Sequence, residues 1–284
     1  MSHEPVNASS QSFDVVVVGG GPAGATAATL LAKSGHKVGL FERQAFPRFH
    51  VGESLVPAVN LTLEKLGVRE RMDELRFPQK HGVQFYGPTG PSKPFYFSEV
   101  ADPRMHHTWQ VLRSDFDRMM LQTAAAEGAH VETDTQVVEV CLEGDTATGV
   151  RVRRLDESES TVSARVVLDA SGQKGVIPRE LSRQCGVPGL ENTAVYAHYD
   201  GVRLDPGIDA GSTLIYRLDA KSWIWFIPLP DVVSIGLVTS AREILRFGQN
   251  RDEILQNGID RCPHLKERLV NAKISGEVRG ARDF

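Results

Sequence analysis

The sequence is poor in cysteine and carries no excess of basic residues. Its three cysteines, Cys141, Cys185 and Cys262, are widely spaced and include no CxxC pair. This usage favours a reducing compartment, here the cytoplasm, and argues against a disulfide scaffold or a zinc site. The histidines at 106–107 and at 198 lack a metal-ligating companion at useful spacing, so no metal site is predicted. The formal net charge of −4 and the isoelectric point of about 6.2 predict no basic surface for nucleic acid.

Long apolar segments are also missing. Residues 1–12 are polar, so they predict a disordered tail rather than a signal peptide. Residues 15–32 contain no charge and approach the length of a membrane span, but glycines and a proline at 19–24 interrupt them. This composition is typical of a strand, a turn and a helix, so we predict no membrane association.

Residues 13–43, FDVVVVGGGPAGATAATLLAKSGHKVGLFER, have the pattern of a βαβ unit. Val15 to Val18 form a β-branched run with the length of a buried parallel strand. A helix is predicted from Pro22 to Lys33 or Ser34, with Gly35 as its stop. A second strand follows and ends in Glu42, about 20 residues after the glycines.

The glycines of this unit match the dinucleotide-binding spacing G-x-G-x-x-G. Gly19 permits the sharp turn, Gly21 lets a pyrophosphate approach the backbone, and Gly24 lets the helix pack closely on the strand. The start of the helix, with Pro22 and Ala23, offers free N–H groups to the phosphates. All five residues are therefore predicted to bind the cofactor.

Glu42 ends the second strand and Arg43 follows it, and both are predicted to contact the cofactor. An acid at this place accepts hydrogen bonds from ribose hydroxyls, and it argues against the 2′-phosphate of NADP. FAD is favoured over NAD because the fingerprint begins within the first twenty residues and no second fingerprint follows. A nicotinamide domain is therefore not evident.

Two later segments resemble FAD-dependent monooxygenases of the hydroxylase type. In ARVVLDASGQKG a hydrophobic strand precedes Asp169, like the strand that returns to the cofactor in that family. In QVLRSDFD, Ser114 is the predicted N-cap of a helix that ends at Gly128. Arg113 occupies the place of an arginine that reaches FAD in that family, and the alternative is a surface arginine. Asp169 and Arg113 are thus predicted cofactor contacts.

Six segments together resemble the flavin-dependent halogenases and occur in that family's order. They are GGGPAG, HVGESLVP (50–57), KHGVQF (80–85), QVLRSDFD, DASG and WIWFIP (223–228). The last segment fits the family signature W-x-W-x-I-P without a mismatch. The Pro-Ala after Gly21 is similar to members that act on phenols, pyrroles or carrier-tethered acyl groups, rather than to members that act on tryptophan.

This resemblance implies a reaction in which Lys80 receives the oxidised halogen before the aromatic substrate does. Reduced FAD and O₂ form a flavin C4a-hydroperoxide, chloride or bromide attacks its distal oxygen, and hypohalous acid travels to the lysine and then to an aromatic carbon. Lys80 would hydrogen-bond the oxidant or carry it as a haloamine, which suits a partly desolvated ammonium with a lowered pKa. Because no nicotinamide site is evident, a separate flavin reductase is expected to supply the reduced FAD. Taken alone, Lys80 is an ordinary surface lysine.

Two further family segments have both a functional and a structural interpretation. Glu53 and Ser54 match a family loop near the flavin and are predicted cofactor contacts, but Ser54 could instead cap a following helix. Alternation along a strand places Trp223 and Trp225 on one face. The resemblance implies that the two indoles keep an organic substrate from the flavin while a halide passes. The alternative is that both are core aromatics of a sheet.

The predicted fold is α/β, with a doubly wound Rossmann-like FAD-binding sheet and an inserted, mostly antiparallel substrate-side sheet. Residues 13–75 and 105–190 are assigned to the first part, and residues 76–104 and 191–284 to the second. Four strands between residues 194 and 240 have the spacing of an antiparallel meander. The later Gly-Asp segment of monooxygenase-type FAD proteins is not found before Phe284. We therefore expect a chain truncated at its C-terminus, with weak FAD binding and little activity by itself.

The nearest alternative function is an FAD-dependent aromatic hydroxylase, which shares the glycine loop and DASG. It has no special need for the paired tryptophans or for Lys80, and it usually reduces its own flavin. A reductase of prenyl chains is a weaker alternative, because no long apolar groove is evident. A non-catalytic FAD-binding fragment is the alternative from a different class.

Overall fold

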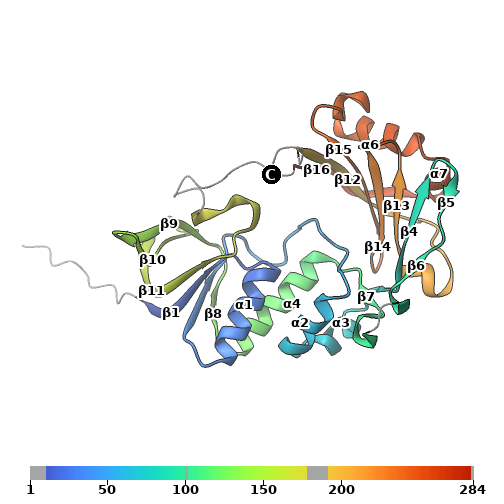
Figure 1. Cartoon of the computed structure of the whole chain (residues 1–284). Coiled ribbons are helices and arrows are strands. Elements are labelled where there is room, and N and C mark those ends of the chain that lie inside the picture. The colour runs from blue at the N-terminus through green and yellow to red at the C-terminus, as the bar shows by residue number, and fades with distance from the viewer. Residues whose placement is uncertain (1–10, 100–101, 178–190, 283–284) are drawn as a thin grey trace, which may run out of the picture. The chain divides into compact units, whose positions relative to one another are not determined.

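A computed structural model describes residues 11–99, 102–177 and 191–282 of the chain (Figure 1). The chain divides into two compact units, and each is described by itself. The first combines residues 1–50 with 113–185, and the second combines residues 51–112 with 186–284. Most of the predicted disordered tail, and Cys185, lie outside the described residues.

The first unit is built on a six-stranded sheet in the order β8-β2-β1-β11-β10-β9. Its strands are β1 (Ser12–Val18), β2 (Val38–Phe41), β8 (His130–Glu132), β9 (Thr135–Glu143), β10 (Thr146–Arg154) and β11 (Glu159–Asp169). The helices α1 (Pro22–Lys33) and α4 (Arg113–Ala126) pack against each other (Figure 1). Strands β8, β2, β1 and β11 are parallel, whereas β10 pairs antiparallel with both β11 and β9. The predicted α/β class is confirmed.

Strand β1 lies between β2 and β11, and its valines are buried on both faces. Val16 and Val18 belong to one apolar cluster with side chains of β9 and β10. Val15 and Val17 belong to a second cluster that includes residues of α1 and α4. Burial on both sides is what the continuous β-branched run predicts for a parallel strand. The strand begins at Ser12, so the last residue of the predicted tail is ordered in the sheet.

The two helices of this unit test the predicted helix ends. α1 runs from Pro22 to Lys33 as predicted, and Gly35 follows it with a φ of +85°. The N-cap prediction at Ser114 is wrong, because α4 already begins at Arg113 and Ser114 lies in its first turn. At 14 residues α4 is the longest described helix, and none of the described helices is long and apolar enough to cross a membrane.

The second unit is built on an eight-stranded sheet, in the order β16-β12-β15-β14-β13-β4-β5 with β6 beside β4. Its strands are β4 (Gly82–Gly87), β5 (Gly90–Pro91), β6 (Phe95–Tyr96), β12 (Asn192–Asp200), β13 (Thr213–Arg217), β14 (Trp223–Pro228), β15 (Val233–Ser240) and β16 (Lys273–Arg282). A separate pair joins β3 (Gln79–Lys80) to β7 (Thr108–Trp109). Its helices are α2 (Val59–Leu66), α3 (Arg69–Glu74), α6 (Arg251–Asp260) and α7 (Pro263–Arg268).

The predicted four-strand meander is only partly correct. Strands β13, β14 and β15 are consecutive antiparallel neighbours, but β12 pairs with β15 and not with β13. Short connections at 218–222 and 229–232 keep the three strands adjacent. The segment 201–212 between β12 and β13 is longer, and the free edge of β13 is occupied by β4 in parallel.

The two compact units divide the chain at other positions than the predicted domains. Residues 51–75 and 105–112 belong with the second unit. On α2, the Asn60 amide donates hydrogen bonds to the carbonyl oxygens of Arg104 at 2.7 Å and His107 at 2.6 Å. The Trp109 indole N–H donates to the Asp73 carboxylate at 3.2 Å. These side-chain contacts join α2 and α3 to residues 104–109, and the local pattern of the sequence does not contain them.

Candidate functional site

The glycine loop between β1 and α1 is compact because two of its glycines have no room for a side chain. Gly19 has a φ of +102°, and a Cβ on it would lie 2.6 Å from the Ala170 carbonyl oxygen. A Cβ on Gly24 would lie 1.9 Å from the carbonyl oxygen of Gly19. The loop is therefore held against α1 on one side and against the residue after β11 on the other.

No side chain caps the free backbone N–H groups at the N-terminus of α1. Gly21 is the N-cap and provides no side chain, Pro22 occupies the first turn, and this turn contains no acidic residue. A Cβ on Gly21 would meet only the Nη2 atom of Arg48, at 3.7 Å. Free backbone N–H groups and the positive end of the helix dipole thus face open space, which suits an anionic group.

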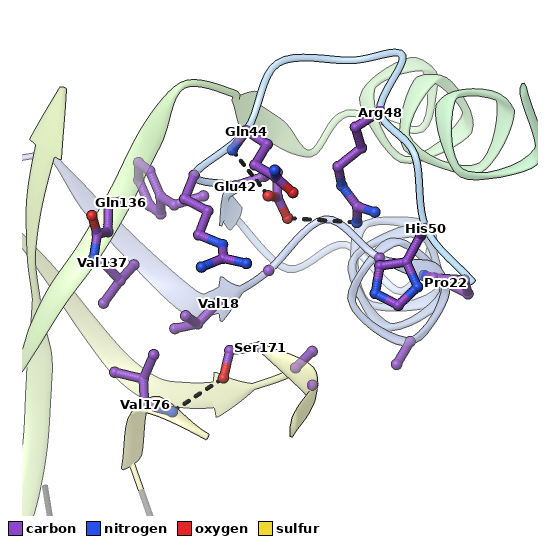
Figure 2. Close-up of a pocket in the computed structure, with 17 residues that line it drawn as sticks. Val18, Pro22, Glu42, Gln44, Arg48, His50, Gln136, Val137, Ser171 and Val176 are labelled. Carbon is purple, nitrogen blue, oxygen red and sulfur yellow. Dashed lines mark hydrogen bonds and ion pairs between the residues drawn. The ribbon is translucent and has the colours of Figure 1, made fainter. Parts of the chain in front are cut away.

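Glu42 lies directly after β2 and is only 5% exposed. Its carboxylate accepts hydrogen bonds from the backbone N–H groups of Gly20 at 2.8 Å and Gln44 at 3.0 Å. Figure 2 shows Glu42 between Gln44 and Arg48. Each carboxylate oxygen keeps a second lone pair, so the carboxylate both holds the glycine loop and can accept from a ligand hydroxyl.

These residues line one pocket of the first unit, with about 980 Å³ of empty space including its opening to solvent. Six of the predicted cofactor contacts lie in its wall: Gly19, Gly21, Pro22, Ala23, Glu42 and Arg43. The sequence analysis did not identify other lining residues, among them Arg48, His50, Gln136 and Ser171 (Figure 2). They come from segments that lie apart from the glycine loop in the sequence and that only the fold brings next to it.

Arg48 is the most informative of the added residues. Its buried guanidinium has Nη1 3.3 Å from the Asp117 carboxylate and Nη2 3.9 Å from the Glu42 carboxylate. Neither Nε nor Nη1 makes a hydrogen bond within the described part of the chain. Buried donors of this kind need a partner, and their place in the pocket beside the start of α1 fits a phosphate. An arginine soon after Glu42, the acid predicted to bind ribose, is the one signal in the sequence that could have indicated it.

Three predicted cofactor contacts of the first unit, Gly24, Arg113 and Asp169, do not line the pocket. Gly24 packs against Gly19 instead. Arg113 is buried and forms a two-pronged ion pair with Asp117, at 2.7 and 2.9 Å. Asp169 accepts hydrogen bonds from the backbone N–H groups of Ser171 at 2.9 Å and Ile177 at 2.8 Å. Asp169 therefore shapes the turn that presents Ser171 to the pocket, and a direct cofactor contact of any of the three residues stays a prediction.

In the second unit, Lys80 is a buried lysine on β3, only 5% exposed. Its ammonium donates hydrogen bonds to the Ser54 hydroxyl at 2.8 Å and to the Leu55 carbonyl oxygen at 3.2 Å, and it lies 5.5 Å from the centre of the Phe97 ring. Within the described residues it forms no ion pair. Burial lowers the pKa of Lys80 from 10.5 to about 8. Lys80 is therefore a buried lysine and not a surface lysine.

The depressed pKa has a consequence for stability that Lys80→Met tests. Between pH 8 and 10.5 the unfolded chain holds the lysine proton and the folded chain does not, so wild-type stability rises with pH in this window. Methionine does not titrate. Any stability advantage of Lys80→Met over the wild type therefore shrinks by about 2 kcal/mol between pH 7 and pH 10. Urea unfolding at both pH values measures it, and a pH-independent difference would contradict the depressed pKa.

Glu53 and Ser54 lie in the second unit and do not line the pocket of the first. Glu53 is 2% exposed, and its carboxylate lies 2.7 Å from Nε2 of His198 on β12. Ser54 does not cap a helix, because α2 begins only at Val59 with Ala58 as its N-cap. It contacts Lys80 instead. A cofactor contact of Glu53 or Ser54 therefore stays a prediction without support from the pocket.

Trp223 and Trp225 lie outside the core of their sheet. The intervening Ile224 and Phe226 are 0% and 1% exposed and belong to the apolar core that includes residues of α6 and α7. The two tryptophans are half-buried on the opposite face. Neither tryptophan therefore belongs to the apolar core that contains Ile224 and Phe226.

The indole of Trp225 is held in place by its neighbours on β15 and β12. Its N–H donates to the Ser234 hydroxyl at 3.1 Å, and its ring lies 5.6 Å from the ring of Tyr196. A Cβ on Gly236, the residue opposite in the ladder, would lie 2.2 Å from the indole. The ring is therefore stacked flat over a glycine that leaves room for it.

The Lys80 ammonium and the two tryptophan side chains lie on the same face of the sheet. Ile215 on β13 is the ladder partner of Trp225, so the two side chains share a face, and Thr213 lies two residues along the same strand. The Ser54 hydroxyl, which accepts from Lys80, lies 3.0 Å from the Thr213 hydroxyl. The ammonium is thus on the tryptophan face and not on the core face.

Comparison with known proteins places these sites in context. A family model described as an FAD binding domain matches residues 12–222. The 1H-pyrrole-2-carbonyl peptidyl-carrier-protein brominase of Pseudoalteromonas luteoviolacea is 33% identical over 284 residues, which is 96% of this chain and 66% of that protein. The tryptophan 2-halogenase of Chondromyces crocatus is 31% identical over 281 residues, which is 96% of this chain and 52% of that protein.

A solved structure agrees with these matches. The flavin-dependent brominase Bmp2 superposes with a TM-score of 0.85 at 32% identity, over 96% of this chain and 67% of that one. The chain thus spans between about half and two thirds of the length of the relatives it matches.

Proposed function

Because the chain belongs to the flavin-dependent halogenase family and carries its FAD-binding domain, we propose that the protein chlorinates or brominates an electron-rich aromatic ring. Reduced FAD, O₂, a halide ion and a proton give oxidised FAD, water and hypohalous acid. Hypohalous acid then replaces an aromatic hydrogen by halogen and releases water. The observation that carries the proposal is Lys80, buried on the tryptophan face without an ion-pair partner among the described residues.

FAD is assigned to the pocket of the first unit, where it supplies the oxidation of the halide. The N-terminus of α1 and the unused donors of Arg48 bind its phosphates, and Glu42 accepts from its ribose. The open side of Gly21 supports this fit, because nothing but the end of the Arg48 side chain stands there. The absence of a second dinucleotide fingerprint supports a separate flavin reductase as the source of reduced FAD.

Lys80 is assigned the transfer of halogen to the aromatic ring. As an ammonium it donates a hydrogen bond to hypohalous acid and polarises it. As an amine it attacks the halogen of hypohalous acid, so that an N–halogen bond replaces the O–halogen bond and water is released. With a pKa of about 8, both forms are populated near neutral pH. Trp223 and Trp225 are assigned the role of a wall that keeps the organic substrate from the reduced cofactor. This assignment is supported by the half-buried positions of both tryptophans on the face of the sheet where Lys80 also lies.

The proposed substrate is a pyrrole-2-carbonyl group on a carrier protein. The 33% identical relative is named for bromination of this group, whereas the 31% identical relative is named for tryptophan. The Pro-Ala after Gly21 favours the first type. A phenol is the second candidate substrate, because the resemblance in the sequence covers phenol-halogenating members equally well.

A mass-spectrometric assay tests the function. The protein is incubated with chemically reduced FAD, O₂, bromide and a pyrrole-2-carbonyl carrier protein, and in parallel with free phenol or tryptophan. Bromine in the pyrrole supports the proposal in full, and bromine in phenol or tryptophan alone supports the chemistry but not the substrate. Added oxygen without bromine favours the hydroxylase. Oxidation of NADH by the protein and FAD, at the rate of product formation, would contradict a separate reductase.

Arg48→Gln tests the assignment of the pocket. Loss of charge-assisted hydrogen bonds to a phosphate is expected to weaken FAD binding by about 10- to 100-fold. Fluorescence titration with FAD measures the dissociation constant. Arg118→Gln is the matched control, because Arg118 is an exposed residue of α4 outside the pocket. Equal affinity of Arg48→Gln and the wild type would remove Arg48 from the site.

A further inference from the structure

The Ser54 hydroxyl stands between the Lys80 ammonium and the sheet. Lys80 donates to Ser54 at 2.8 Å, and the Ser54 and Thr213 hydroxyls lie 3.0 Å apart. Thr213 in turn accepts a hydrogen bond from the amide nitrogen of Gln110 at 2.9 Å. Lys80 is thus the end of a chain of three hydrogen bonds that finishes on a fully buried glutamine.

The orientation of the Gln110 amide fixes the direction of the hydrogen bonds at the far end of this series. The Gln110 amide nitrogen also lies 2.9 Å from the Gly211 carbonyl oxygen, which only accepts. The NH₂ group of Gln110 must therefore face both Gly211 and Thr213, and the Thr213 hydroxyl oxygen accepts a hydrogen bond from it. The Thr213 hydroxyl keeps its own proton, which it can donate to Ser54.

The two hydroxyls let the chain serve either form of Lys80. When Lys80 is charged, it donates to Ser54, whose oxygen accepts. When Lys80 is neutral, Ser54 can donate a hydrogen bond to the amine and accept a hydrogen bond from the Thr213 hydroxyl, while Gln110 still donates to Thr213. A carboxylate in place of Ser54 would hold only the charged form, and an apolar side chain would hold neither.

The backbone on both sides of Ser54 is also held. The Glu53 carbonyl oxygen accepts from the Val111 N–H at 2.7 Å, and the Leu55 N–H donates to the Trp109 carbonyl oxygen at 3.2 Å. The Glu53 carboxylate is anchored on His198. Ser54 therefore has little freedom to follow Lys80 and instead imposes a position on it.

We propose that Ser54, supported by Thr213 and Gln110, is a positioning residue that holds the Lys80 nitrogen in one place in both its charged and its neutral form. The proposal rests on the role of Lys80 in the proposed function. Two of the three N–H donors of the ammonium are engaged, by Ser54 and Leu55. The third is left for hypohalous acid, at a position that Ser54 determines.

The charged groups near Lys80 do not supply the stabilisation that Ser54 gives to its ammonium. The titratable groups on the elements packed around it are Glu53 with its partner His198, Asp73, His81, Glu99, His107 and Asp209. None of these groups shifts the pKa of Lys80, which burial alone lowers. Removal of the Ser54 hydroxyl would thus act on an ammonium that has no ionic partner among the described residues to compensate.

The pH profile of Lys80 acylation tests the proposal. Brief treatment with acetic anhydride between pH 6 and pH 10, followed by mass spectrometry of the Lys80 peptide, reports the fraction of free amine. The wild-type midpoint is expected at about 8. In Ser54→Ala the midpoint falls by about one pH unit, because the charge-assisted hydrogen bond of the ammonium to Ser54 is stronger than the hydrogen bond of the neutral amine, so the charged form loses more while burial persists. Ser54→Thr keeps the hydroxyl and is expected to restore the wild-type profile.

A purely structural role for Ser54 predicts another outcome. Unchanged or raised midpoints in a Ser54→Ala protein with the wild-type circular dichroism spectrum would overturn the proposal. If Ser54→Ala does not fold, Thr213→Val carries the test, since it removes the hydroxyl behind Ser54 and is expected to lower the midpoint by about half a unit. An unchanged midpoint in folded Thr213→Val would then overturn it.

The labelling uses neither FAD nor halide, so it separates the two proposals. A shifted profile in a protein without halogenating activity would leave Ser54 as the positioning residue and reject the proposed function. An unshifted profile in an active halogenase would reject the positioning role alone. In an active protein, Ser54→Ala is expected to lower kcat for halogenation about tenfold while the oxidation rate of reduced FAD stays unchanged.

Discussion

Lys80→Ala is expected to reduce halogenation of the aromatic substrate by about 10³-fold, the range for loss of a positioned acid or hydrogen-bond donor. Among the described residues that contact one another at this site, the variant removes the cation that polarises hypohalous acid and the amine that can form a haloamine, whereas Ser54 and Leu55 offer a neutral hydroxyl and a carbonyl. Reduced FAD is still oxidised, because the FAD pocket belongs to the first unit and Lys80 to the second.

The measurement compares halogenated product with consumed FADH₂ in the same reaction. The wild type couples the two, whereas Lys80→Ala is expected to release hypohalous acid that an added thiol or amine trap consumes. Lys93→Ala is the matched control, because Lys93 is an exposed lysine of the same unit. Full product formation by Lys80→Ala would show that the halogen reaches the substrate without this residue, and the assignment would fail.

Gly24→Ala is expected to abolish measurable FAD binding, with a loss of at least about 100-fold in affinity, and to lower the free energy of unfolding by about 2–4 kcal/mol. The added Cβ would lie 1.9 Å from the Gly19 carbonyl oxygen and 3.1 Å from its carbonyl carbon, both backbone atoms. Neither can move unless β1 and α1 separate. The glycine loop then no longer presents its N–H groups to the phosphates.

Two other glycines make the comparison specific. Gly87→Ala adds the same atom where nothing lies within 4 Å, so both stability and FAD affinity should stay as in the wild type. Gly21→Ala meets only the end of the Arg48 side chain, at 3.7 Å. It is expected to keep the stability but to weaken FAD binding, since the methyl group enters the space for the phosphates. Thermal unfolding and FAD titration of the three variants give both quantities, and wild-type affinity in Gly24→Ala would disprove the close packing.

Local patterns in the sequence predicted a good part of what the structure contains. The Val15–Val18 strand, the start and end of α1, and the position of Glu42 after β2 agree with the structure. Steric requirements of glycine and proline and the period of apolar residues act between neighbours in the chain, so they can be read without tertiary information. The alternation that sets Trp223 and Trp225 on one face is of the same kind.

The sequence could not predict contacts between distant segments. Ser54 was read as a flavin contact or a helix cap, but it accepts from Lys80, 26 residues further on. Glu53 pairs with His198 across 145 residues, and β12 pairs with β15 rather than with the next strand. Arg48 reaches the pocket only because residues 43–50 fold back over the start of α1. Each of these follows from long-range packing, which no local pattern encodes.

By itself, the sequence determined the glycine loop and the family, and it singled out Lys80 as the candidate lysine, because each depends on short motifs with strict steric or chemical demands. Only the tertiary structure decided the environment of that lysine. Lys80 is buried, its pKa falls to about 8, and its nitrogen is held by Ser54 and not by an acid. The physical reason is that desolvation and hydrogen bonding depend on which atoms surround a group in space, and those atoms come from β7, from Phe97 and from Ser54 and Leu55.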